Sequence, residues 1–165
     1  MINIFSKIFD KESFPPADDN AVLAVCSGEL IPPYKIKDKV FASEMMGKTI
    51  AIEPTDNTIL SPVNGRIEVL YPTGHAFAVK ANNGTGYLIH IGIDTVNLNC
   101  KCFKVLKKQG DSVKAGEPVV KVNFKEIEKN SLLCTTMIIV VSPIEDKNYE
   151  YIDYGHVEKG QIISR

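Results

Sequence analysis

Residues 73–96, TGHAFAVKANNGTGYLIHIGIDTV, decide the fold because they contain two apolar runs separated by a strong turn signal. The runs 76–80 and 86–91 have the length and the aromatic and β-branched content that strands favour. Asn82-Asn83-Gly84 between them favours a tight reversal, since Asn and Gly tolerate left-handed backbone conformations. The stretch therefore predicts an antiparallel β-hairpin.

The hairpin carries one histidine near each open end, His75 and His90. If Asn82 and Asn83 are the central turn residues, the numbers of paired residues sum to 165 and the histidines lie directly opposite each other. If Asn83 and Gly84 are central, the sum is 167 and the histidines are diagonal neighbours. Either odd sum places both side chains on one face, whereas an even sum would separate them. We expect a shared face and imidazoles near enough to share one ligand, although a single histidine is usually structural.

The surroundings of His90 indicate what such a pair would do. His90 lies in an apolar run and is followed by Gly92 and Asp94. Burial disfavours the charged imidazolium, and a neutral ring nitrogen is what in-line attack on phosphorus requires. His75 would donate a hydrogen bond to the phosphoryl oxygens, and Thr73 would hold the His75 ring in the right tautomer. The chain has no glycine-rich nucleotide loop, so we do not expect ATP in a P-loop as the donor.

Short apolar runs recur on both sides of the hairpin at intervals of about ten residues. This spacing favours an all-β fold, an antiparallel β-sandwich or barrel-like domain, over βαβ units. A short helical insert is expected at residues 124–133, where Phe124 and Ile127 have helical spacing. The other expected strands are residues 21–25, 49–52, 66–71, 102–106, 119–122, 136–141 and 149–154.

Composition supports the same fold class and excludes several functions. The chain has 165 residues, enough for one ample core, and its 34 Ile and Val residues against 9 Leu favour strands. A net charge of −1 gives no electrostatic footprint for nucleic acid. No apolar run approaches the ~20 residues that span a bilayer.

The N-terminal segment differs from the rest of the chain. Residues 1–18 are predicted to be an amphipathic segment and flexible tether, and residues 19–165 a single domain. Residues 1–10 would contact a membrane surface, dock in a groove of a partner, or fold back onto the domain's own core. The start lacks the features of a signal peptide, so we expect a cytoplasmic protein, or one peripheral at the inner membrane face. The apolar side of the segment consists of Ile2, Ile4, Phe5, Ile8 and Phe9.

The four cysteines are expected to be reduced in such a compartment. The four are Cys26, Cys100, Cys102 and Cys134. Cys100 and Cys102 lack the second pair that a structural zinc site needs, so these two are expected to pack in or near the core. His156 lies outside every motif and is expected in a surface turn.

Several stretches together resemble the glucose-family IIA component of the bacterial phosphoenolpyruvate:sugar phosphotransferase system. They are residues 62–65, 73–77, 88–96 and 110–116, with Phe103, and the resemblance covers roughly residues 20–165. It implies an antiparallel β-sandwich of the duplicated hybrid motif type with short helical inserts. The loop at Gly47-Lys48-Thr49 departs from the family pattern, as do Lys80 and Gly86, where family members often carry acidic residues.

The resemblance also implies roles for the site residues. His90 would accept the phosphoryl group at Nε2, His75 would stabilise it, Thr73 would orient His75, and backbone around Gly92 and Asp94 would border the site. The donor would be HPr and the acceptor the IIB domain of a sugar permease, either a separate IIB or part of an IICB protein. Some members bind transporters or enzymes such as kinases when unphosphorylated. No cofactor is required, although a histidine pair like His75 and His90 helps to ligate zinc in one regulatory complex.

Partners would dock on an apolar rim around the histidines, with carboxylates facing a basic carrier. The expected docking residues are Asp38, Val40, Phe41, Met45, Met46, Tyr71, Leu88 and Val96. Two alternatives remain open: a regulatory IIA-like domain without phosphotransfer, and a zinc hydrolase on a similar scaffold that uses the histidines and Asp94.

Overall fold

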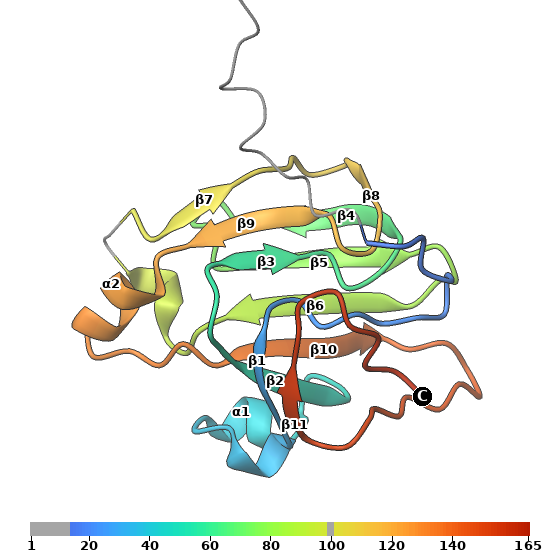
Figure 1. Ribbon diagram of the computed structural model, residues 1–165, viewed down its shortest axis with the longest axis horizontal. Coiled ribbons are helices and arrows are strands. Elements are labelled where there is room, and N and C mark those ends of the chain that lie inside the picture. The colour runs from blue at the N-terminus through green and yellow to red at the C-terminus, as the bar shows by residue number, and fades with distance from the viewer. Residues whose placement is uncertain (1–13, 99–100) are drawn as a thin grey trace, which may run out of the picture.

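The computed structural model describes residues 14–98 and 101–165, and within them eleven strands form two antiparallel sheets (Figure 1). The larger sheet has the order β11-β1-β2-β10-β6-β5-β4-β8, and the smaller has the order β3-β9-β7. Two short helices, α1 (Lys39–Ala42) and α2 (Phe124–Lys129), complete the described fold with the 3-10 turns η2 (Pro33–Lys35) and η3 (Thr95–Asn97). The strands are β1 (Gly28–Ile31), β2 (Thr49–Pro54), β3 (Thr58–Leu60), β4 (Gly65–Leu70), β5 (Ala76–Ala81), β6 (Gly86–Ile91), β7 (Phe103–Val105), β8 (Ser112–Val113), β9 (Pro118–Val122), β10 (Thr136–Ser142) and β11 (Gly155–Val157). The predicted all-β antiparallel class is confirmed.

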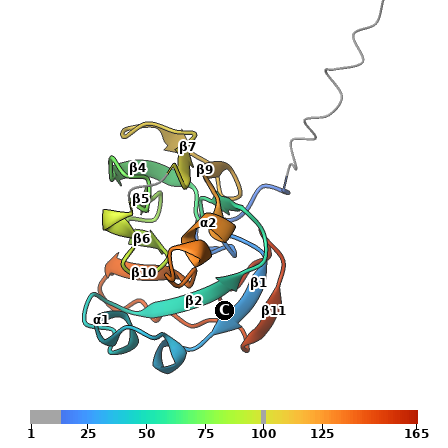
Figure 2. The ribbon, with the colours of Figure 1, turned by 90° about the vertical axis from the view of Figure 1, so that its left-hand side faces the viewer.

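The two sheets face each other and enclose the main core (Figures 1 and 2). Ile89 of β6, Phe77 of β5 and Val120 of β9 are completely buried there, so both sheets contribute side chains to one apolar cluster. Ile and Val dominate this cluster because branched side chains pack well on pleated surfaces.

A second, smaller cluster covers the opposite face of the larger sheet. Leu88, Met137 and Ile139 point away from the main core and pack against Phe41 of α1. Strand β6 is therefore buried on both faces, which explains why it appears in the sequence as an almost unbroken apolar run. His90 is half-buried, whereas the other five residues of β6 are buried.

The register of the β5–β6 hairpin corrects the sequence argument. Ala76 pairs with His90 and Lys80 with Gly86, so paired numbers sum to 166, an even value that neither predicted turn gives. The loop has three residues, because the amide of Ala81 donates to the carbonyl of Thr85. Gly84 at the third position has φ +96°, the left-handed conformation that closes a three-residue hairpin loop.

Other differences concern the ends of elements. The predicted helix at 124–133 ends at Lys129, because Asn130 caps it and Ser131 takes a left-handed conformation. Residues 21–25 and 149–154 form no strand, only isolated bridges, with Leu23 opposite Ile162 and Tyr151 opposite Ser164. Strands β1, β3, β8 and β11 and helix α1 were not predicted. His156, expected in a turn, is exposed as expected but lies in β11.

Two of the described cysteines are free, Cys26 and Cys134. Cys102 is buried, as expected, but it is disulfide-bonded, so the expectation of reduced thiols is wrong for this residue. The predicted amphipathic segment, residues 1–10, and the first part of the tether lie outside the described residues. Among residues 14–98 and 101–165, no helix is long and apolar enough to cross a membrane.

Candidate functional site

His75 and His90 meet at the open end of the hairpin. Their ring centroids are 5.2 Å apart and the ring planes are nearly perpendicular, at 80°. The even register would separate them if both lay in regular strand, but His75 precedes the first residue of β5. The chain enters β5 from a turn in which the amide of Gly74 donates to the carbonyl of Tyr71. Strand alternation therefore does not fix the direction of the His75 side chain, and the predicted proximity is correct for a different reason.

The Nδ1 atom of each ring has a hydrogen-bond partner, and these partners define the tautomers. Nδ1 of His90 lies 2.8 Å from the carbonyl oxygen of Gly92, which can only accept, so Nδ1 carries the proton. Nε2 of His90 then has a free lone pair. Nδ1 of His75 is hydrogen-bonded to Oγ1 of Thr73. When the Thr73 hydroxyl donates, Nε2 of His75 carries the proton and is a hydrogen-bond donor.

Burial favours the neutral form of both rings. His75 is only 4% exposed, and burial lowers its pKa below the ordinary 6.5, assisted by the nearby His90. Burial also lowers the pKa of His90, while the Gly92 carbonyl and the carboxylates of Asp38 and Asp94 act in the opposite direction. The pair therefore offers one nucleophilic nitrogen next to one donor, with two carboxylates available to compensate a positive charge on His90.

Two aromatic rings enclose the pair. Phe41 lies 4.9 Å from His90 and Tyr71 lies 5.3 Å from His75, measured between ring centroids. Phe41 is held by α1, whose N-cap is Asp38: its Oδ1 accepts from the amides of Val40 and Phe41. Asp38 thus fixes one wall of the site and influences the charge of His90 at the same time.

Of the expected docking residues, Asp38 is half-buried and the seven apolar ones fall into two groups. Val40, Met45, Met46, Tyr71 and Val96 are exposed, between 42% and 78%, so they are available to a partner. Phe41 and Leu88, expected at the same rim, are instead at least nine-tenths buried, because they pack in the cluster beneath the site. Asp94 is exposed and precedes η3 in a left-handed conformation, with φ +59°.

The residues that hold the loop after His90 were not predicted from the sequence. The buried hydroxyl of Thr95 donates to the carbonyl of Ile91 at 2.5 Å, and the amide of Gly92 donates to the carbonyl of Thr135. These bonds fix the Gly92 carbonyl that orients His90. Thr95 belongs to the motif that follows His90, but no role was predicted for it. No signal in the sequence identifies Thr135. No group of three or more His, Cys, Asp or Glu side chains among the described residues could hold a metal ion.

Comparisons with known proteins place the chain in a family. The model of the family described as phosphoenolpyruvate-dependent sugar phosphotransferase system, EIIA 1, matches residues 20–145. The chain therefore belongs to the EIIA family of sugar phosphotransferase systems, and the resemblance read from the histidine motifs is confirmed.

Particular relatives are similar over nearly the whole chain. The chain is 37% identical to the glucose-specific EIIA component of Staphylococcus aureus (strain COL) over 158 residues, which cover 96% of this chain and 95% of the relative. It is 35% identical to the corresponding component of Staphylococcus epidermidis (strain ATCC 12228 / FDA PCI 1200), with the same coverage. The solved structure of glucose permease IIA from Mycoplasma capricolum matches with a TM-score of 0.82 and 33% identity, covering 87% of this chain and 93% of that one.

Proposed function

We propose that this EIIA component carries a phosphoryl group on Nε2 of His90. It would receive the group from HPr and pass it to the IIB domain of a sugar permease, with glucose-type transport suggested by the relatives. The observation that carries this proposal is the hydrogen bond from Nδ1 of His90 to the Gly92 carbonyl, which leaves Nε2 as a directed nucleophile.

The first step would be an in-line displacement at phosphorus. The lone pair of Nε2 of His90 forms the new N–P bond while the bond to the carrier's nitrogen breaks, and the carrier retains that electron pair. His90 becomes cationic, and the Gly92 carbonyl together with the carboxylates of Asp38 and Asp94 stabilises this charge. The second step would reverse the geometry: a permease cysteine thiolate attacks phosphorus and His90 leaves as neutral imidazole.

His75 would act on the transferred group rather than accept it. With Nδ1 bound to Thr73, its Nε2–H is a donor on the side shared with His90, where the phosphoryl oxygens would lie. The exposed rim residues Val40, Met46 and Val96 would contact the partner proteins, because flexible or branched apolar side chains adapt to more than one surface.

Incubation with phosphoenolpyruvate, the general carrier enzyme and HPr, followed by intact mass measurement, tests the division of labour. His90→Ala should gain no phosphate. His75→Ala should gain one phosphate but transfer it slowly to an isolated IIB domain. His156→Ala, a histidine exposed on β11, is the matched control and should behave as the unchanged protein. A His75→Ala variant that accepts nothing would contradict the proposed roles.

The remaining expectations stay predictions. Regulatory binding of transporters or kinases, membrane contact through residues 1–10 and a peripheral location each require direct measurement. Zinc would be held by the Nε2 atoms of His75 and His90, with further ligands supplied by a partner. Absence of phosphate on the wild-type chain would instead favour the regulatory alternative without phosphotransfer, while family membership does not favour the zinc hydrolase.

A further inference from the structure

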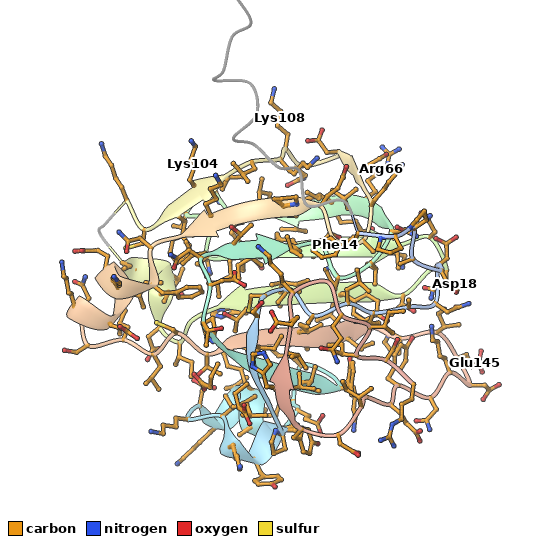
Figure 3. The ribbon with its side chains drawn as sticks, in the orientation of Figure 1. Phe14, Asp18, Arg66, Lys104, Lys108 and Glu145 are labelled. Atoms are coloured by element: carbon orange, nitrogen blue, oxygen red, sulfur yellow. The ribbon has the colours of Figure 1, made fainter. Side chains whose placement is uncertain are left out.

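The chain from Phe14 to Asn20, called the arm below, includes Phe14 and Asp18, which are labelled in Figure 3. The arm contacts Asn64 and Asn82, which flank the turn ends of β4 and β5. His75 and His90 lie at the other end of β5 and β6, so about six residues at ~3.3 Å each, roughly 20 Å, separate the arm from the phosphoryl site.

Phe14 anchors the arm by close contact with two turns. A Cβ atom built at Gly116 would come within 2.5 Å of the Phe14 ring, and one built at Gly160 would overlap the same ring. Only glycine therefore allows the ring to lie against both turns. Because the two turns belong to distant parts of the chain, Phe14 joins them at one point of the surface.

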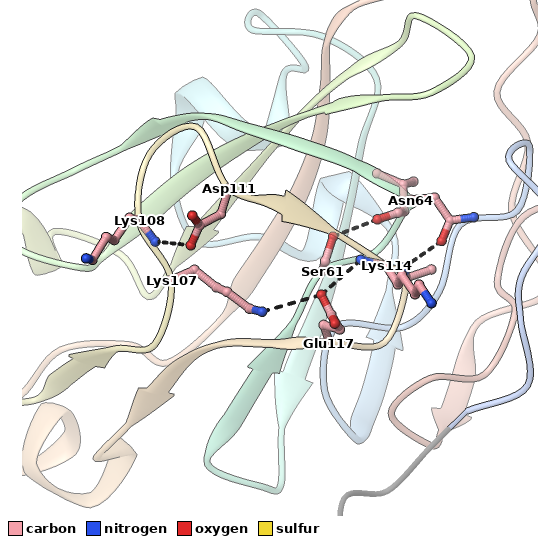
Figure 4. A network of polar contacts seen from close by, with 9 residues as sticks. Ser61, Asn64, Lys107, Lys108, Asp111, Lys114 and Glu117 are labelled. Atoms are coloured by element: carbon pink, nitrogen blue, oxygen red, sulfur yellow. Dashed lines mark hydrogen bonds and ion pairs between the residues drawn. The ribbon is translucent and has the colours of Figure 1, made fainter.

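Side-chain amides hold the arm behind Phe14. Nδ2 of Asn64 donates to the carbonyl of Ala17 at 2.9 Å and to Oδ1 of Asp19 at 3.0 Å, and Nδ2 of Asn82 donates to the same Asp19 oxygen. Oδ1 of Asn64 accepts from the amide of Ala115. The facing loop is fixed as well, since Glu117 accepts from the amide of Lys114 and pairs with Lys107 (Figure 4).

Between the arm and this loop lies a groove of about 660 Å³. Its walls include Pro15 and Ala17 of the arm and Val113, Ala115 and Pro118 of the facing segment, with Lys114 and Glu117 among the polar residues that also line it. The groove shares no residue with the histidine site. Its volume and mostly apolar walls are typical of sites that take large apolar groups.

We propose that this groove receives the apolar side of residues 1–13 of the same chain. Ser13 is bonded directly to Phe14, which forms part of the groove wall, so the apolar residues nearest to it cannot be far away. Phe9 is five residues before Phe14, within about 8 Å along a helix or ~17 Å of extended chain. Such a short connection gives an effective concentration in the millimolar range.

The segment itself needs an apolar surface. The sequence predicts Ile8 and Phe9 on one side of a helix that would be too short to be stable alone in water, so burial against a surface would have to supply the stabilisation. Docking in the groove would cover this side and leave the phosphoryl site open to partners. A membrane would then have to compete with the groove for the same residues.

The absence of tryptophan in the chain allows a clean test. Phe9→Trp introduces a single indole, whose emission in buffer without lipid should be blue-shifted and protected from acrylamide. Adding Ala115→Glu, which places a carboxylate in the groove, should shift the emission to that of an exposed indole and raise quenching several-fold. Ser43→Glu, at an exposed position beside α1, is the matched control and should change neither quantity. Far-ultraviolet circular dichroism establishes that each variant is folded.

Three results would overturn the inference. The indole could show the emission of exposed tryptophan in the unchanged background. It could be protected there and remain equally protected after Ala115→Glu, which would place the segment elsewhere on the domain. It could become protected only when vesicles containing anionic phosphatidylglycerol are added, which would assign the segment to the membrane. Because no phosphotransfer is measured, none of these results depends on the proposed function.

Discussion

Replacing Thr73 by valine separates the role of His75 from that of His90. The substitution keeps the branched shape but removes the hydroxyl that binds Nδ1 of His75. Thr73 is exposed, so the free energy of unfolding should change by less than about 0.5 kcal/mol. The His75 ring would then no longer be held in the tautomer whose Nε2–H faces His90.

The expected magnitude follows from one hydrogen bond. The bond in question runs from Nε2–H of His75 to the phosphoryl oxygens, and it strengthens as charge develops during transfer. Such a bond is worth about 1–2 kcal/mol, so onward transfer should slow by roughly 5- to 30-fold. Rapid-quench transfer of radioactive phosphate from the phosphorylated protein to an isolated IIB domain measures this rate. The amount of phosphate accepted by His90 at equilibrium with an excess of donor should stay unchanged.

Two further variants make the test specific. Thr73→Ser restores the hydroxyl and should recover most of the rate. Thr85→Val removes a hydroxyl that binds Tyr149 at the turn end of the hairpin, and it should lower stability without slowing transfer. Unchanged transfer in Thr73→Val, or complete loss of phosphate acceptance, would refute the positioning role.

Three other predictions follow from the site and the core. Because burial lowers the pKa of His90 below 6.5, phosphate acceptance should be constant above pH 6.5 and decline only at lower pH; a decline centred above pH 7 would contradict the assignment. Val96→Glu, at an exposed rim position, should weaken HPr binding at least tenfold by calorimetry. Ile162→Glu, at an exposed position in the C-terminal segment, should not weaken it. Equal effects of the two substitutions would show that the rim is not the surface that binds HPr. Burial raises the pKa of Cys134 to about 11 and raises that of Cys26 further. Alkylation of both thiols at pH 8 should therefore be slow until the protein is unfolded. Rapid labelling of the native protein would argue against the burial of these cysteines.

The same burial links the histidines to stability. Below pH 6.5 the unfolded chain binds protons that the buried histidines resist, so the unfolded state holds more protons than the native state. The free energy of unfolding should therefore fall as pH drops below 6.5 and stay level above it. Urea titrations between pH 5 and 8 measure this dependence, and His75→Gln should reduce it. An increase in stability on acidification would contradict buried neutral rings.

The fold class could be predicted because strand length and composition are local properties. Strand β6 agrees with its predicted bounds, and β5 differs by one residue. The loop length could not be predicted in the same way, since Asn82-Asn83-Gly84 suits both two- and three-residue loops and tertiary packing selects one. Strands β3 and β8 have only three and two residues, too few to show any periodicity.

The candidate site was predictable where a motif contains it and not where tertiary packing creates it. His90, Gly92 and Asp94 lie in one short string, and their proximity follows from the chain itself. The direction of the His75 ring depends on the turn before β5, which alternation does not describe. Whether Phe41 is exposed depends on α1, a one-turn helix that tertiary contacts position.

The most direct test of the account is the position of the phosphoryl group on the protein. Nitrogen-15 and phosphorus-31 NMR of the histidine-labelled protein, phosphorylated through phosphoenolpyruvate and HPr, identifies both the residue and the ring nitrogen. The hydrogen bond from Nδ1 of His90 to Gly92 predicts a single adduct at Nε2 of His90, with Nδ1 still protonated. A phosphoryl group at Nδ1 of His90, or on His75, would contradict it.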